Sequence, residues 1–113
     1  MTSLEQGLPG GELSGSPFTG QIIFTDGGIV AVQAMNTEGD DPENPYAVNG
    51  YEAYYGSYEV SDDGRTVTFE IESSVVRDLI GQSLERAIAV TEDSLVVTPT
   101  SADENWRVTY ERQ

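Results

Sequence analysis

The sequence predicts a single all-β domain, built as an antiparallel up-and-down barrel with one short helix. Short apolar segments recur along the 113 residues between clusters of Gly, Pro, Asp and Asn, and no long stretch has the helical period. The hydrophobic content of 37% is too high for a disordered chain, and the length suits one hydrophobic core. Closing such a meander into a barrel removes its unpaired strand edges.

Residues 1–17 are predicted to form a flexible N-terminal arm, and residues 18–113 the barrel domain. The arm is rich in Gly and Pro with isolated Leu residues, so it buries little surface. A hairpin follows, with a strand over 18–25, a turn at Asp26-Gly27-Gly28 and a returning strand over 29–35. Residues 36–45 then combine two prolines with four acids, which predicts an exposed loop.

The central segment contains the most regular strand pattern. Residues 46–60 are rich in aromatics and predict one bent strand or two short ones, with Gly56 at a bulge or sharp bend. Residues 65–72 alternate, so that Val67, Phe69 and Ile71 share one face of a strand. This pattern predicts that the three apolar side chains face the core.

The last third predicts a short helix and three strands. The helix over 75–80 lies between Ser73-Ser74, which suit an N-cap, and Gly81, which suits a stop; it would act as a lid or as a plug. Strands are expected over 83–90, 94–98 and 105–111. In the last of them Trp106, Val108 and Tyr110 share a face.

Composition excludes several classes of function. The 20 acidic residues outnumber the 5 basic ones and give a formal net charge of -15, which repels nucleic acid and anionic membranes. The chain has no Cys and no His, so disulfides and zinc-thiolate sites are excluded and no cofactor is expected. The start of the chain lacks the basic and apolar regions of a signal peptide, which predicts a cytoplasmic protein.

A metal site is not expected either. The acids of the 36–45 loop lack the glycine-spaced ligand pattern of a calcium loop, and the prolines stiffen it. These acids are Glu38, Asp40, Asp41 and Glu43.

The sequence resembles the bacterial lipocalin-like domain family over roughly residues 18–112. The segments that carry the resemblance are Gly20 to Gly28, Tyr54 to Val60, Thr66-Val67-Thr68, Gly81 before Arg86, and Leu95 to Pro99 before Trp106. The resemblance implies a calycin-type β-barrel. The family's opening Gly-x-Trp strand is absent, which predicts that a second copy of the chain completes the barrel. Phe69 and Glu70 stand where the family carries histidines, so no histidine-based function is implied.

Arg86 is the most informative candidate for a site residue. It shares a strand face with Leu84, Ile88 and Val90, so a cation is expected on an otherwise apolar surface. One interpretation is that its stem packs while its head pairs with an acid such as Glu70 or Glu72. The other is that it anchors a carboxylate or enolate of a ligand inside the barrel.

The candidate ligand-binding residues are two charged residues, Arg86 and Glu70, and three aromatic ones, Tyr54, Tyr58 and Trp106. Tyr54 and Tyr58 share a strand face and Tyr55 lies on the other. Aromatic side chains at this spacing either pack in the core or line a pocket with their hydroxyls aimed at a ligand. Trp106 has the same two interpretations, and no residue is assigned a catalytic role.

Three functions fit this pattern. An eight-stranded barrel holds one small ligand or is filled by its own side chains, so binding of a small, largely apolar molecule is the leading hypothesis. A cofactor-independent cyclase or isomerase acting on a polyketide-like substrate is the second, because ring closure needs conformational restraint and few polar contacts. The third is a structural or interaction domain completed by homodimerisation.

Overall fold

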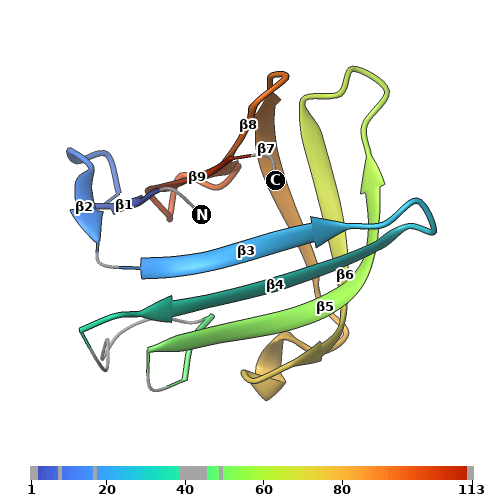
Figure 1. Ribbon diagram of the computed structural model, residues 1–113, viewed down its shortest axis with the longest axis horizontal. Helices are drawn as coiled ribbons and strands as arrows, with labels where there is room; N and C mark the ends of the chain where they lie inside the picture. The colour runs from blue at the N-terminus through green and yellow to red at the C-terminus, as the bar shows by residue number, and fades with distance from the viewer. Residues whose placement is uncertain (1–2, 8, 17, 39–45, 49, 112–113) are drawn as a thin grey trace.

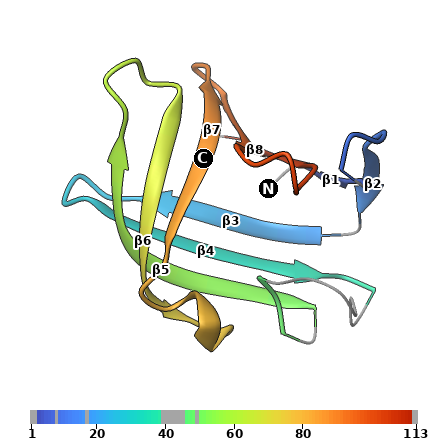
Figure 2. The ribbon, with the colours of Figure 1, turned by 180° about the vertical axis from the view of Figure 1, so that it is seen from behind.

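The protein is a single curled sheet of nine antiparallel strands, which confirms the all-β prediction. The computed structural model describes residues 3–7, 9–16, 18–38, 46–48 and 50–111. Figures 1 and 2 show the sheet wrapped around its interior, with β3 opposite β8 and β9. The elements in chain order are β1 (Ser3–Gln6), β2 (Ser14–Ser16), β3 (Phe18–Phe24), β4 (Ile29–Asn36), β5 (Tyr51–Val60), β6 (Thr66–Ser74), η1 (Arg77–Leu79), β7 (Ser83–Val90), β8 (Ser94–Pro99) and β9 (Trp106–Glu111). Nothing helical in this described part of the chain is long and apolar enough to cross a membrane.

From β4 to β9 each strand pairs with the one before it, as expected for an up-and-down meander. The hairpin between β3 and β4 turns through Gly28, whose φ of 84° lies in the left-handed region that glycine adopts without strain. The predicted loop over 36–45 lies mostly outside the described residues.

Gly56 lies at a break in strand register, as the sequence predicts. The pairing of β5 with β6 shifts between Tyr55 and Gly56. A Cβ atom at Gly56 would lie 1.8 Å from the backbone oxygen of Glu70, so no larger residue fits there without moving the backbone. The glycine therefore lets β5 bend around the interior.

The N-terminal residues differ from the expected arm. β1 pairs with both β2 and β9, so Ser3–Gln6 and Ser14–Ser16 belong to the sheet. Composition alone predicted no strand here because the segment has little apolar surface, but backbone pairing with β9 needs none. These two segments are therefore paired in the sheet, while a flexible arm over residues 1–17 and a domain limit at residue 17 stay predictions.

The short connection between β2 and β3 brings the two ends of the sheet together. β2 and β3 are the two outermost strands of the sheet, yet a single residue separates them in sequence. Since β2 pairs with β1 and β3 with β4, the chain passes from one end of the sheet to the other there. The sheet must therefore curl into a barrel-like shape.

The predicted helix is reduced to one 3-10 turn, η1. Ser74 precedes it, and its Oγ accepts a hydrogen bond of 3.0 Å from the Val76 N–H. Gly81 follows with a φ of 85°, as expected for a glycine stop. Leu79 is buried with the core residues, so the turn plugs the end of the core.

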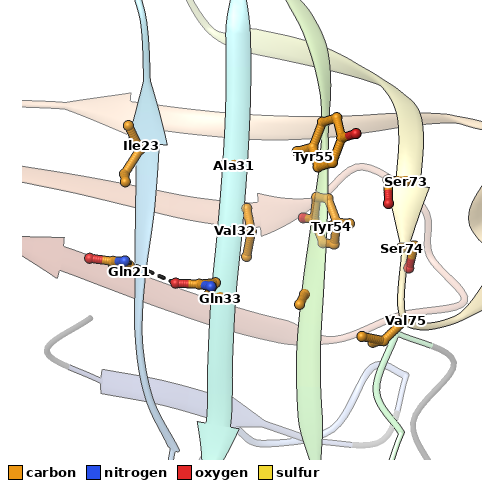
Figure 3. A pocket seen from close by; sticks show the side chains of 11 residues that line it. Gln21, Ile23, Ala31, Val32, Gln33, Tyr54, Tyr55, Ser73, Ser74 and Val75 are labelled. Atoms are coloured by element: carbon orange, nitrogen blue, oxygen red, sulfur yellow. Dashed lines mark hydrogen bonds between the residues drawn. The ribbon is translucent and has the colours of Figure 1, made fainter.

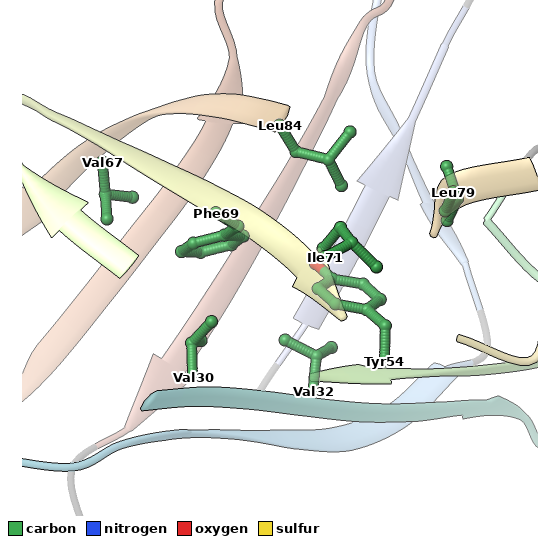
Figure 4. Packing of buried hydrophobic residues seen from close by; sticks show 8 residues of the cluster. All are labelled: Val30, Val32, Tyr54, Val67, Phe69, Ile71, Leu79 and Leu84. Atoms are coloured by element: carbon green, nitrogen blue, oxygen red, sulfur yellow. The ribbon is translucent and has the colours of Figure 1, made fainter. Parts of the chain in front are cut away.

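The core consists of two clusters. The larger one gathers side chains from β4, β5, β6, η1 and β7 around Phe69, which is 1% exposed (Figure 4). The smaller one joins β1, β8 and β9 through Leu4, Val97, Val108 and Tyr110. The predicted inward face of the 65–72 strand is confirmed by the burial of Val67, Phe69 and Ile71.

The curled sheet leaves a groove between its first long strand and its last two. β3 lines one side, and the ends of β8 and β9 line the other. The groove has a volume of about 810 Å³, and Ile22, Leu95 and Tyr110 from the core border it. Apolar surface of the interior is therefore reachable from this side.

Candidate functional site

A pocket of about 350 Å³ lies at the end of the sheet where β5, β7 and β9 approach the N-terminal strands. Each of these strands contributes one polar or aromatic side chain, and the segments before β5 and β9 contribute two more. The residues that determine its chemistry are Tyr46, Glu52, Arg86, Glu104 and Trp106.

Arg86 is at the centre of this pocket. Strand alternation turns it inward with Leu84, and it is 6% exposed, as the sequence predicts for this face. Val90 departs from the predicted face, because it is 67% exposed at the end of β7. The guanidinium carbon lies 5.1 Å from the centre of the Tyr46 ring and 5.0 Å from the centre of the Trp106 ring. Both rings thus stabilise the buried cation through their faces.

The Arg86 head pairs with an acid, as one interpretation expected, but the acid is Glu104 and not Glu70 or Glu72. Arg86 Nη1 lies 3.7 Å from Glu104 Oε2. Glu70 is exposed and accepts a hydrogen bond of 2.6 Å from the Ser83 hydroxyl. The alternation that buries Phe69 turns Glu70 and Glu72 to the outer face, so the structure does not bring Glu70 to the pocket.

Tyr46 holds Glu104 in place. Its hydroxyl donates a hydrogen bond to Glu104 Oε1. Burial raises the pKa of Tyr46, and the hydrogen bond to Glu104 adds to this effect. Arg86, Glu104 and Tyr46 therefore form one connected group on the wall of the pocket.

Glu52 is a polar residue of the pocket that the sequence reasoning missed. It lies on β5 two residues before the buried Tyr54, so it points to the interior, where it is partly buried. Burial raises the pKa of Glu52 to about 7, and the nearby Arg86 opposes the shift. Strand alternation from Tyr54 was the signal that would have identified it. Tyr46 had no such signal, because it lies outside any strand.

Trp106 carries an unsatisfied donor. Its indole Nε1 is buried and has no hydrogen-bond partner among the described residues. The side chain lines the pocket and also packs against the cluster of Leu4, Val97, Val108 and Tyr110. Trp106 therefore both packs against the core and lines the pocket, and its N–H lacks an acceptor.

Neither of the two predicted tyrosines lines the pocket. Tyr54 is buried in the larger core cluster, where its ring lies 6.4 Å from that of Phe69. Tyr58 packs edge-on against Phe24, and its hydroxyl donates a hydrogen bond of 2.9 Å to the Thr25 carbonyl. The shared inward face is as predicted, but both side chains have packing roles in this structure.

No metal centre is found among the described residues, where no three Asp or Glu side chains cluster as ligands. Asp40, Asp41 and Glu43 of the acidic loop lie outside the described part of the chain.

A curled up-and-down antiparallel sheet that encloses an apolar core and opens into a pocket is the architecture of barrels that hold small ligands. The comparison with protein families agrees with this class. The chain belongs to the lipocalin-like domain family, whose family model matches residues 14–112. The match begins at β2, within the segment expected to be an arm. No curated protein and no solved structure matches the chain.

Proposed function

We propose that this protein binds a small, largely apolar molecule in the pocket around Arg86. The observation that carries the proposal is a space of about 350 Å³ that Trp106 lines, while the buried indole N–H of this residue has no hydrogen-bond partner among the described residues. Ligand sites combine such a space with apolar walls and a few convergent polar groups. Leu4, Val108 and the Trp106 ring supply the apolar walls, and Arg86 and Glu52 supply polar groups.

The experiment is a titration with N-phenyl-1-naphthylamine, a neutral apolar dye that becomes fluorescent when it leaves water. We expect saturable binding at one site per chain, and native mass spectrometry should show the same adduct. Trp106→Phe and Arg86→Met should each weaken dye binding about fivefold or more, which corresponds to about 1 kcal/mol.

The matched control is Arg65→Met. It removes the same charge from an exposed position just before β6, so dye binding should not change. Circular dichroism checks that each variant folds. Absence of saturable dye binding to the wild-type chain, or equal loss in the control, contradicts the proposal.

A second candidate is turnover of the bound molecule by ring closure or isomerisation without a cofactor. Glu52 favours it, because a carboxyl group whose pKa is about 7 exchanges a proton readily near neutral pH. Such a reaction would move a proton from carbon to the Glu52 carboxylate and return it to another carbon. Hydrogen–deuterium exchange at the carbon beside the carbonyl of bound 1-tetralone, followed by NMR, tests this. Exchange at the same rate with Glu52→Gln would refute it.

A further inference from the structure

We propose that the Arg86 pocket takes a neutral molecule that accepts a hydrogen bond through a carbonyl oxygen, in preference to a carboxylate or an amine. This inference rests on the proposed function and names the ligand class of the same site. It also replaces the expectation that Arg86 anchors an anion. Three observations support it: the charge balance of the pocket, its unsatisfied donor and the state of Glu52.

The charge balance disfavours an anionic ligand. One cation, Arg86, lines the pocket together with three carboxylates, Glu52, Asp103 and Glu104. Arg86 already lies 3.7 Å from Glu104, and its faces are covered by two aromatic rings. A ligand carboxylate would have to displace Glu104 and would meet the remaining acids, which is costly in a shielded site.

The unsatisfied donor of Trp106 requires an acceptor. An indole N–H only donates, and leaving it buried without a partner costs about 1–3 kcal/mol. Trp106 lines the pocket, so a ligand carbonyl oxygen that reaches this buried N–H would remove the cost, whereas an ammonium group has no acceptor to offer. An ammonium group would in addition lie close to the Arg86 guanidinium, which has the same charge.

Glu52 supplies a second donor when it carries its proton. The groups that interact with it electrostatically are Arg86 on β7, Tyr54 on its own strand and Tyr110 on β9. Tyr46 and Glu104 line the same pocket. Burial outweighs the attraction of Arg86 and raises the Glu52 pKa to about 7. A neutral ligand that displaces water from the pocket favours the protonated form further, so binding takes up a proton near neutral pH.

The test uses three naphthalene probes with the same ring and different charges: 2-acetylnaphthalene, 2-naphthoate and 2-naphthylmethylammonium. Calorimetry with the wild-type chain should show that the ketone binds about tenfold more tightly than either ion. Affinity for the ketone should fall as the pH rises from about 6 to about 8.5, with proton uptake visible in buffers of different ionisation enthalpy. Glu52→Gln keeps a neutral donor, so ketone affinity should be retained and its pH dependence lost.

Each outcome is decisive. Tightest binding of the naphthoate or the ammonium, or an unchanged pH dependence in Glu52→Gln, overturns the ligand class. If the dye N-phenyl-1-naphthylamine binds but none of the three probes does, the ligand class fails while the proposed function stands. If the dye does not bind either, the proposed function itself fails.

A second inference concerns the outer face of β3, β4 and β5, which the pocket does not use. Here Ile23 lies opposite Ala31, and Ala31 lies opposite Tyr55. Ile23 is 48% and Tyr55 50% exposed. Beside them Gln21 Nε2 donates a hydrogen bond of 3.0 Å to Gln33 Oε1 (Figure 3). This surface is hollowed by about 280 Å³. We refer to it as the neutral face.

The neutral face is distinctive because the two hollows in it are lined by uncharged residues only, while Glu59 on the same side of β5 lies beyond them. None of the residues that line this hollow or the adjoining one beside Met35 and Tyr51 is charged, although 22% of the chain is. A basic partner finds no acid to pair with there, and polyanions are repelled by the net charge of -15. We infer that a second copy of this chain covers it, because this face allows two acidic chains to meet without opposing carboxylates.

The contact would be isologous, with the same face on both copies. Sedimentation equilibrium should show a dimer that becomes stronger with added salt, since salt screens the repulsion between the two net charges. Tyr55→Glu should weaken the dimer about tenfold or more, because it places two carboxylates at the contact. Val90→Glu adds the same charge at an exposed valine of β7 outside the neutral face and should have no comparable effect. A monomer at all salt concentrations, or equal effects of both variants, overturns the inference.

Discussion

Glu5 on β1 and Arg107 on β9 form a two-point ion pair, in which Arg107 Nε and Nη2 each donate a hydrogen bond of 2.8 Å to one Glu5 oxygen. The two residues are directly opposite in the strand register. The pair thus joins β1 to β9 beside β2, the strand that leads into β3 at the other end of the sheet.

We expect Glu5→Gln to loosen β1. Its ion pair with Arg107 lowers the Glu5 pKa, chiefly through the hydrogen bonds. The pair therefore stabilises the fold above the ordinary carboxyl pKa of 4.5, and this contribution is lost as the pH falls through the lowered value. Amide hydrogen exchange in β1 should be faster in Glu5→Gln than in the wild type at neutral pH. Glu111→Gln, at the exposed end of β9, is the control, and faster exchange of β1 in both variants would contradict the pairing role.

Gly56→Ala should destabilise the protein strongly. The new methyl group would lie 1.8 Å from the Glu70 backbone oxygen, and the bulge of β5 cannot move without disrupting its pairing with β6. We expect the free energy of unfolding to fall by about 3 kcal/mol in urea denaturation. Gly27→Ala is the control, because the nearest atom to its new methyl group is 3.8 Å away. A loss of less than about 1 kcal/mol at Gly56 would show that the bulge adapts.

Glu52→Gln should stabilise the folded protein above neutral pH. The pKa of Glu52 is about 7 in the folded state against 4.5 for an ordinary carboxyl group. Between these values the unfolded state releases a proton that the folded state keeps, so wild-type stability falls as the pH rises from about 4.5 to 7. The Gln variant avoids this cost, which is at most about 3 kcal/mol. Urea denaturation at about pH 4 and pH 8 measures the difference.

The control for this charge change is Glu59→Gln on the same strand, because Glu59 is exposed. It should show no comparable gain between the two pH values. A gain of equal size in both variants would indicate relief of the overall negative charge instead of the burial of Glu52.

Trp106→Phe should separate stability from binding. The variant removes a buried donor that has no partner, which offsets the smaller ring, so the free energy of unfolding should stay within about 1 kcal/mol of the wild type. Ketone affinity measured by calorimetry should fall because the acceptor oxygen loses its indole partner. Loss of stability by several kcal/mol with unchanged ligand affinity would assign Trp106 to packing alone.

The sequence alone was sufficient for the parts of the fold that depend on local pattern. Alternation predicted that Val67, Phe69 and Ile71 face the core, and turn residues predicted the hairpin at Gly28 and the bend at Gly56. Such signals come from neighbouring residues along one strand, so they do not depend on how the strands meet. Arg86 was identified for the same reason, as a cation at an inward position.

Only the tertiary structure decided which residues meet. Glu104 pairs with Arg86 because β9 and the segment before it lie across the pocket, a relation that no local pattern contains. Glu52 lies in the site because curling of the sheet brings the inward face of β5 near Arg86 on β7. Residues 3–6 form the strand β1 because their backbone pairs with the edge of β9. Each of these contacts joins segments far apart in the chain, and the backbone geometry of the curled sheet determines them.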